Sequence, residues 1–146
     1  MRMESGRPEA KVEQEKFKSE GEIQVARLLD RSGISYLYEH PLAVVDRGKV
    51  RIWYPDFQLV GYGILIEYCG RTGDPAYTAG VVRKQAVYKA NGLTGIMLTP
   101  ESLRGDWPGQ ILGEIEEVLT ERLYRFRRQS ASRAGERARF TRGEGR

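Results

Sequence analysis

Two acidic residues, Asp56 and Glu67, interrupt the otherwise apolar stretch IWYPDFQLVGYGILIEYCG, which spans residues 52–70. A carboxylate buried in a sheet costs free energy unless its charge is paired. We expect two strands joined by a tight turn at GYG, a hairpin that can bring the acids side by side, although the sequence does not fix the register. Two adjacent carboxylates repel each other and are tolerated when they share a proton or bind a divalent cation.

Hard oxygen ligands of this kind suit Mg²⁺, which binds one or two carboxylates and keeps several waters. The sequence therefore predicts a site for Mg²⁺, or Mn²⁺ in its place, held by Asp56 and Glu67, with the backbone carbonyl of Tyr68 as a further ligand. The alternative is that both acids point to solvent on an edge hairpin. The surroundings favour the metal site, because proline precedes Asp56 and the apolar run 64–66 precedes Glu67.

The elements that must position these acids follow from apolar periodicity and from turn residues. Apolar residues recur at helical spacing within 19–33, and Asp74 followed by Pro75 is a favourable helix start. The predicted order is a helix at 19–33, strands at 34–45, 50–60 and 64–69, a helix at 75–90, a strand at 93–99 and a helix at 107–126. This order predicts an α/β fold, a mixed four-stranded sheet between two helical layers, with a parallel crossover through the helix at 75–90.

Composition describes an ordinary globular chain, with 40% hydrophobic and 30% charged residues among 146. The single cysteine, Cys69, fits a reducing compartment, and no apolar run or N-terminal leader suggests a membrane span or secretion. We expect a cytoplasmic protein with a polar segment at 1–18, one domain at 19–128 and a disordered tail at 129–146. Residues 122–146 hold nine arginines and two glutamates, so the rest of the chain has 15 basic and 18 acidic residues.

The motif YPDF, whose Asp56 is separated by ten residues from the Glu67 of EYC, resembles the PD-(D/E)XK nuclease superfamily, whose fold is restriction-endonuclease-like. The resemblance covers about residues 19–100, and the ordered motifs are similar to those of a branch of phage and bacterial proteins. It implies that Asp56 and Glu67 hold Mg²⁺, that a lysine orients or activates the attacking water, and that a glutamate of the first helix assists.

The position of the motif lysine, two residues after Glu67, is occupied by Cys69, and a thiol does not replace an ammonium group. Lys84 is the candidate replacement. Four residues of the predicted helix recur every three or four positions and share one face, which can look back at the acids: Tyr77, Val81, Lys84 and Tyr88. Lysines moved to this helix occur in the superfamily. The alternative is that Lys84 is a solvated surface cation.

Glu22 is the candidate for the assisting glutamate of the first helix. It also fits a capping box with Ser19, in which each side chain accepts a hydrogen bond from the other residue's backbone. Both interpretations remain open on the sequence alone.

The function predicted is a Mg²⁺-dependent endonuclease that hydrolyses nucleic acid, with DNA as the favoured substrate. The predicted nucleic-acid contacts are Arg83, Lys89, Tyr77, Tyr88, Arg127 and Arg128, and the arginine-rich tail suits phosphate contact or serves only as a solubilising segment. The alternative function is a catalytically inactive nucleic-acid-binding or assembly module, and a homodimer or larger assembly is compatible with either. An unrelated structural protein would bind neither metal nor nucleic acid.

Overall fold

The computed structural model describes residues 16–71 and 73–141. Its elements are α1 (Glu20–Arg31), β1 (Tyr36–Tyr38), β2 (Leu42–Asp46), β3 (Lys49–Trp53), β4 (Phe57–Leu59), β5 (Ile64–Tyr68), α2 (Pro75–Ala90), β6 (Thr94–Leu98), the 3-10 helix η2 (Pro100–Leu103) and α3 (Trp107–Thr141). No helix within the described ranges is both long and apolar enough to cross a membrane.

The main sheet has the strand order β1-β4-β5-β6. Strand β4 pairs with its neighbours β1 and β5 in the antiparallel sense, whereas β5 and β6 are parallel and connected through α2. The predicted mixed four-stranded α/β sheet is therefore confirmed. Helix α2 begins as expected, because the Asp74 side chain accepts hydrogen bonds from the backbone N–H groups of Ala76 and Tyr77.

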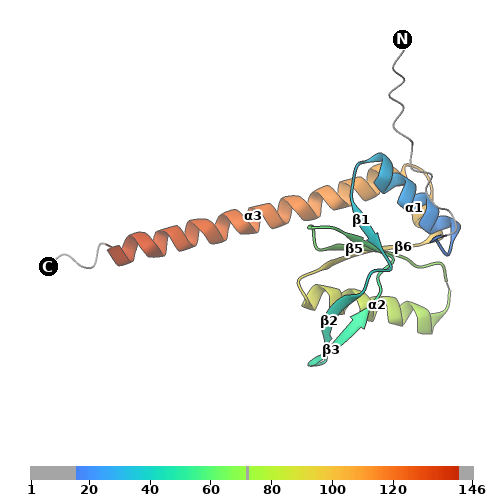
Figure 1. Cartoon of the computed structure of the whole chain (residues 1–146), viewed down its shortest axis with the longest axis horizontal. Coiled ribbons are helices and arrows are strands. Elements are labelled where there is room, and N and C mark those ends of the chain that lie inside the picture. Colours follow the sequence, from blue (N-terminus) through green and yellow to red (C-terminus); the bar gives the residue numbers. More distant parts are fainter. Residues whose placement is uncertain (1–15, 72, 142–146) are drawn as a thin grey trace, which may run out of the picture.

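Two apolar cores lie on the two faces of this sheet, and together they define three layers (Figure 1). Helices α1 and α3 cover one face, where Leu29, Phe57 and Ile66 are fully buried. Helix α2 and strand β2 cover the other face around Val44, Leu65 and Tyr88. Alternate residues of β5 serve opposite cores, which is the period of a strand that is buried on both faces.

Two of the predicted strands are wrong in their length, because each breaks in the middle and contributes to two sheets. The stretch 34–45 breaks between β1 and β2, where Glu39 has a φ of 46° and a proline follows His40. The stretch 50–60 breaks at Tyr54 and the buried Pro55, which cannot donate to a ladder. Strands β2 and β3 form a separate hairpin that packs on α2.

Helix α3 extends to Thr141 and so differs from the disorder predicted from residue 129. Apolar content is too low there for a core, which is why the sequence suggested disorder. Arginine, alanine and glutamate are nonetheless good helix formers, and a helix already nucleated on the domain extends without a new nucleation cost. Residues 142–146 of the predicted tail, and 1–15 of the polar N-terminal segment, lie outside the described residues. The domain boundaries remain a prediction.

Candidate active site

Asp56, directly before β4, and Glu67, near the end of β5, meet at one edge of this antiparallel strand pair. The two strands pair with Phe57 opposite Ile66, so one further step along the ladder sets Asp56 opposite Glu67. The backbone N–H of Tyr68, the residue after Glu67, donates to Oδ2 of Asp56 at 2.7 Å. The hairpin expected from the sequence thus has the register that brings the two acids together.

The environment of Asp56 disfavours its charged form. Burial, and then the negative charges of Glu67 and Glu22, raise the pKa of this carboxyl from 3.8 to about 7, although the Tyr68 N–H and the Lys84 ammonium oppose the rise. Near neutral pH this aspartate is therefore poised between its two protonation states. A cation that approaches a carboxyl group with such a raised pKa stabilises its charged form.

Glu67 is buried at 5% exposure and has two partners from helix α2. The hydroxyl of Tyr88 donates to Oε1 at 2.6 Å, and Nζ of Lys84 lies 3.3 Å from the same oxygen. The Lys84 side chain is 41% exposed, so the pair lies at the rim of the buried site. Burial and then the hydrogen bond to Glu67 raise the pKa of Tyr88, which keeps its hydroxyl protonated.

The helix face proposed from the sequence does point at the acids. Lys84 and Tyr88 contact Glu67, and Tyr77, further toward the N-terminus of α2, interacts with Cys69 through its hydroxyl and thiol groups. The position of Lys84 beside Glu67 agrees with the expectation, whereas its chemical role stays a prediction. Tyr88 is wrong as a nucleic-acid contact, because its side chain is fully buried between Glu67 and the ring of Trp53.

Cys69, at the position of the motif lysine, is buried at 7% exposure. Burial and then the charge of Glu67 raise the pKa of its thiol, although Lys84 and Tyr77 oppose the rise. A thiol with a raised pKa is neutral at physiological pH and supplies neither a cation nor a thiolate. Any positive charge at the acids must come from another residue, and Lys84 supplies it.

Glu22 forms the capping box, which is one of the two interpretations that the sequence left open, and its role as an assisting glutamate stays a prediction. Its Oε2 accepts hydrogen bonds from the backbone N–H of Ser19 at 3.1 Å and that of Lys18 at 2.8 Å, and the Ser19 hydroxyl accepts from the Glu22 N–H, which completes the capping box. The same oxygen accepts from the hydroxyl of Tyr38 at 3.0 Å. Glu22 is also 5% exposed and close enough to raise the pKa of Asp56.

Sequence reasoning missed how α1 is seated at the site. The ring of Tyr68 packs on the backbone of Gly21, where an added Cβ would lie 2.2 Å from the ring. Only glycine allows this approach, which sets Glu22 beside the end of β5. The sequence contains a signal for this contact in the SEGE motif. Glycine is a poor helix former, so a glycine in the first helical turn indicates a different structural requirement.

Arg83 pairs with an acidic residue outside the candidate site. Its guanidinium pairs with Oδ2 of Asp46, which is 3% exposed, and Nε of Arg51 lies 3.3 Å from the same oxygen. This cluster ties the β2–β3 hairpin to α2, so Arg83 has a structural partner that the predicted nucleic-acid role did not anticipate. Lys89, Arg127 and Arg128 are exposed, as a contact with nucleic acid requires.

The described residues include no group of three or more histidine, cysteine, aspartate or glutamate side chains arranged to hold a metal ion. The acidic site is therefore a pair of carboxylates, Asp56 and Glu67, with Glu22 nearby and engaged in its own hydrogen bonds.

No protein-family model matches the sequence, and no curated protein matches it. Among solved structures, the chain is similar to the catalytic domain of the homing endonuclease I-Bth0305I, with a TM-score of 0.48 and 20% identity. The similarity covers 68% of this chain and 93% of that one.

Proposed function

We propose that this chain is a divalent-metal-dependent nuclease that hydrolyses phosphodiester bonds in nucleic acid, with DNA as the substrate. The observation that carries the proposal is the meeting of Asp56 and Glu67 at the ends of paired strands, with the Lys84 ammonium 3.3 Å from Glu67. Two carboxylates and a lysine in one partly buried place are the groups that metal-assisted phosphodiester hydrolysis needs. The resemblance to the PD-(D/E)XK superfamily rests on the same residues.

The donor set fits Mg²⁺ or Mn²⁺. The hydrogen bonds described above use Oδ2 of Asp56 and Oε1 of Glu67, and we assign the metal to the other oxygen of each carboxylate and to the Tyr68 carbonyl. Gln58, two residues from Asp56 along β4, has a buried Oε1 without a hydrogen-bond partner among the described residues, which suits a site completed by water or a ligand. A bound divalent ion supplies Lewis acidity and a water of lowered pKa.

The residues of the chain have separate tasks in this proposal. Asp56 and Glu67 bind the ion, and Tyr88 fixes the Glu67 carboxylate by its hydrogen bond. Lys84 orients the attacking water or stabilises the charge that develops on the phosphate, the task given to the motif lysine in the family. Glu22 adds negative potential near Asp56 and anchors α1 beside the site.

The test is cleavage of supercoiled plasmid DNA with Mg²⁺ or Mn²⁺, compared with the same reaction in EDTA. We expect nicked or linear product only with metal, and none from Asp56→Asn or Glu67→Gln. Both variants preserve side-chain volume, and circular dichroism checks that they fold. Wild-type rates in either variant would show that the site is assigned wrongly.

The second candidate is a catalytically inactive nucleic-acid-binding or assembly module on the same fold. The observation that favours it is the buried, neutral Cys69 at the motif lysine position. As a nucleic-acid-binding module the chain should bind DNA in EDTA and cleave it with neither metal. A protein that neither binds nor cleaves DNA would contradict both the nuclease and the nucleic-acid-binding module.

A further inference from the structure

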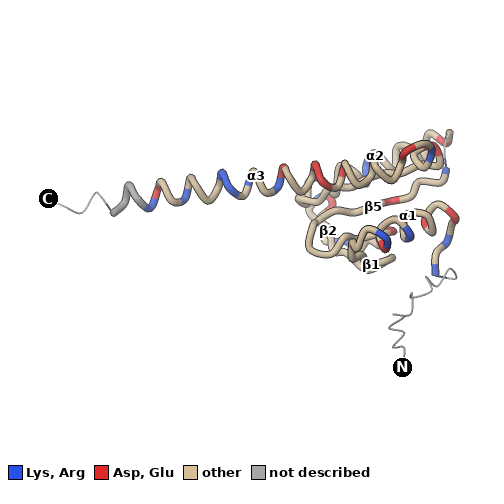
Figure 2. The backbone as a smooth tube through the Cα atoms, turned by 90° about the horizontal axis from the view of Figure 1, so that it is seen from above, with Lys and Arg blue, Asp and Glu red and all other residues tan. Residues whose placement is uncertain are grey.

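Helix α3 leaves the domain after Arg122. The guanidinium of Arg122 donates to the carbonyl oxygens of Tyr62, Gly63 and Gly92 at 2.6 to 3.2 Å, and so ties the helix to the turns before β5 and β6. Every residue from 123 to 137 is exposed, and the helix runs out from the body beyond this anchor (Figures 1 and 2). We call residues 123–137 the arm.

The arm is strongly basic. It holds five arginines and a single acid, Glu136, a net charge of +4 over 15 residues, although the chain without residues 122–146 is net acidic. The arginines are Arg125, Arg127, Arg128, Arg133 and Arg137. No lysine is used, and arginine is the residue whose planar fork matches phosphate geometry.

These arginines surround the helix and do not form one stripe. At about 100° per residue, their positions leave no sector wider than about 100° without an arginine. A helix that rests on a flat acidic surface needs cations on one side only. Cations on all sides suit a helix that lies between two rows of phosphates.

The exposed apolar residues of the arm do not form a seam for a second helix. Leu123, Tyr124 and Phe126 lie in its first turn, at 52% to 67% exposure, and the guanidinium of Arg128 lies over the Tyr124 ring at 4.6 Å. From residue 127 to 137 the arm has no large apolar side chain. A helical partner needs apolar residues repeated along the full length, so a coiled coil with a second copy is disfavoured.

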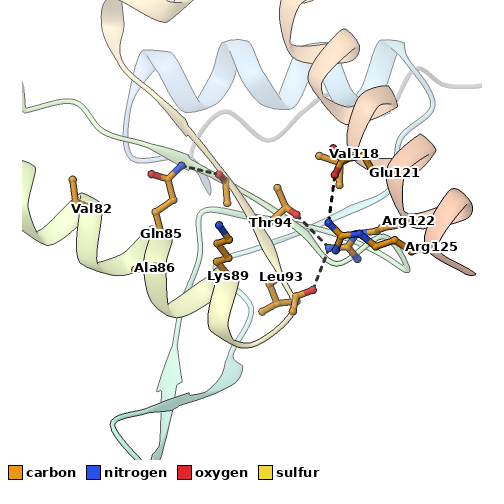
Figure 3. A pocket seen from close by; sticks show the side chains of 12 residues that line it. Val82, Gln85, Ala86, Lys89, Leu93, Thr94, Val118, Glu121, Arg122 and Arg125 are labelled. Atoms are coloured by element: carbon orange, nitrogen blue, oxygen red, sulfur yellow. Dashed lines mark hydrogen bonds and ion pairs between the residues drawn. The ribbon is translucent and has the colours of Figure 1, made fainter. Parts of the chain in front are cut away.

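A groove at the base of the arm extends the basic surface onto the domain. It lies between α2 and α3 along the start of β6, with a volume of about 790 Å³, and Lys89 and Arg125 line it from opposite helices (Figure 3). Gln85 and Thr94 add polar groups, and Glu121 pairs with Arg125 at 3.8 Å. Arg125 belongs to both the groove and the arm, so the two surfaces are continuous.

We propose that the arm lies in the major groove of duplex DNA and holds phosphates of both strands, with the groove at Lys89 and Arg125 receiving the backbone where it reaches the domain. An α-helix is about 10–12 Å across and the major groove of B-DNA is about 12 Å wide, whereas the major groove of duplex RNA is too narrow and deep. The arm is about 22 Å long, equal to about six base pairs. The inference rests on the nucleic-acid part of the proposed function, and not on cleavage.

The experiment measures binding of the full chain to fluorescent DNA duplexes of increasing length by anisotropy, in EDTA so that cleavage cannot interfere. The variant Arg127→Gln, Arg128→Gln, Arg133→Gln removes three charges from the arm. The matched control, Arg27→Gln, Arg31→Gln, Arg104→Gln, removes three exposed charges from α1 and the segment after η2. Circular dichroism checks helix content, and a lysine version of the arm variant retains the charge.

We expect the arm variant to bind at least about tenfold more weakly, with a slope of log affinity against log salt that is smaller by about 2.7, or 0.9 for each lost phosphate contact. The control should change the slope by less than about 1, and the lysine version should retain most of the wild-type slope. As the duplex is lengthened, the affinity of wild type should rise over about six base pairs, the length of the arm, whereas the affinity of the arm variant should not. Wild type should also protect guanine N7 in the major groove from methylation.

Equal salt slopes for the arm variant and the control would overturn the proposal, as would wild-type binding that leaves guanine N7 reactive. Tighter binding to duplex RNA than to DNA would also overturn it. These readouts need no catalysis, so an inactive enzyme with an arm-dependent footprint would contradict the nuclease proposal alone. Metal-dependent cleavage without that footprint would contradict the arm alone.

Discussion

Replacement of Asp56 by asparagine should stabilise the metal-free protein at pH 8, although it destroys the proposed site. The pKa of this carboxyl is about 7 in the fold against an ordinary value of 3.8. At about 1.36 kcal/mol for each pKa unit the difference corresponds to about 4 kcal/mol, which we reduce to about 2 kcal/mol because Asp56 is partly exposed and solvent screens it. Asparagine carries no charge and can still accept the hydrogen bond from the Tyr68 N–H.

The sign follows from proton linkage. A carboxyl with a raised pKa in the fold prefers to stay protonated there, so its contribution to the free energy of unfolding is full below pH 4. That contribution is lost as the pH rises through about 7. The stability gained by Asp56→Asn should therefore be near zero at pH 4 and reach about 2 kcal/mol at pH 8.

The assay is urea denaturation in EDTA at several pH values, with Asp46→Asn as the matched control. Asp46 is buried, whereas Asp56 is half-buried, and Asp46 is paired with Arg51 and Arg83. Its replacement leaves these cations without their acid and should destabilise the protein by about 1–3 kcal/mol at pH 8. If Asp56→Asn is less stable than wild type at pH 8, or if its effect does not vary with pH, the description of Asp56 as a half-buried carboxyl that is not ion-paired is refuted.

Three further predictions concern the metal, the lysine and the seating of α1. Mg²⁺ at a hundredfold excess over its dissociation constant should stabilise wild type by about 2.7 kcal/mol in urea denaturation and leave the asparagine variant unchanged, and equal stabilisation of both would contradict the site. Lys84→Ala should lower kcat with metal binding retained, whereas Lys89→Ala, on the exposed side of α2, should raise KM only. Cys69→Lys, added to the Lys84→Ala protein, should restore part of the lost activity, because the thiol shares the electrostatic environment of the acids and Lys84. Gly21→Ala should lower the free energy of unfolding by about 1–3 kcal/mol, and Tyr68→Ala should relieve part of that cost, so strictly additive effects would argue against the contact.

The order along the chain of the elements around the main sheet, and the helix at 75–90, could be predicted from the sequence because they depend on local signals. Apolar alternation, the Asp74 cap and the glycine turns act over a few residues. Asp56 could be placed near Glu67 because a tight hairpin restricts the possible registers. Helical periodicity likewise placed Lys84 on the face of α2 that meets Glu67.

Features that depend on contacts distant in sequence could not be predicted. The breaks at Glu39 and Pro55 divide two apparent strands between two sheets, and periodicity does not reveal which sheet a residue joins. Tyr88 was placed on the helix face toward the acids, but the sequence did not show that Trp53 of the β2–β3 hairpin packs on its ring and that the side chain is fully buried. The extension of α3 was missed because low hydrophobicity argues against a core but does not prevent a helix that begins on the domain from continuing.

The three hydrogen bonds accepted by Oε2 of Glu22 link the beginning of the folded domain to the electrostatics of its site. Donors from Lys18, Ser19 and Tyr38 converge on this one oxygen. If the first turn of α1 frays, the Glu22 carboxylate loses its two backbone donors and moves away from Asp56, whose pKa it raises in the closed state. Local opening at this terminus is therefore opposed by the hydrogen bonds and favoured by charge repulsion at the site. The amide protons of Lys18 and Ser19 consequently act as built-in reporters, whose exchange with solvent slows when negative charge at the site is neutralised.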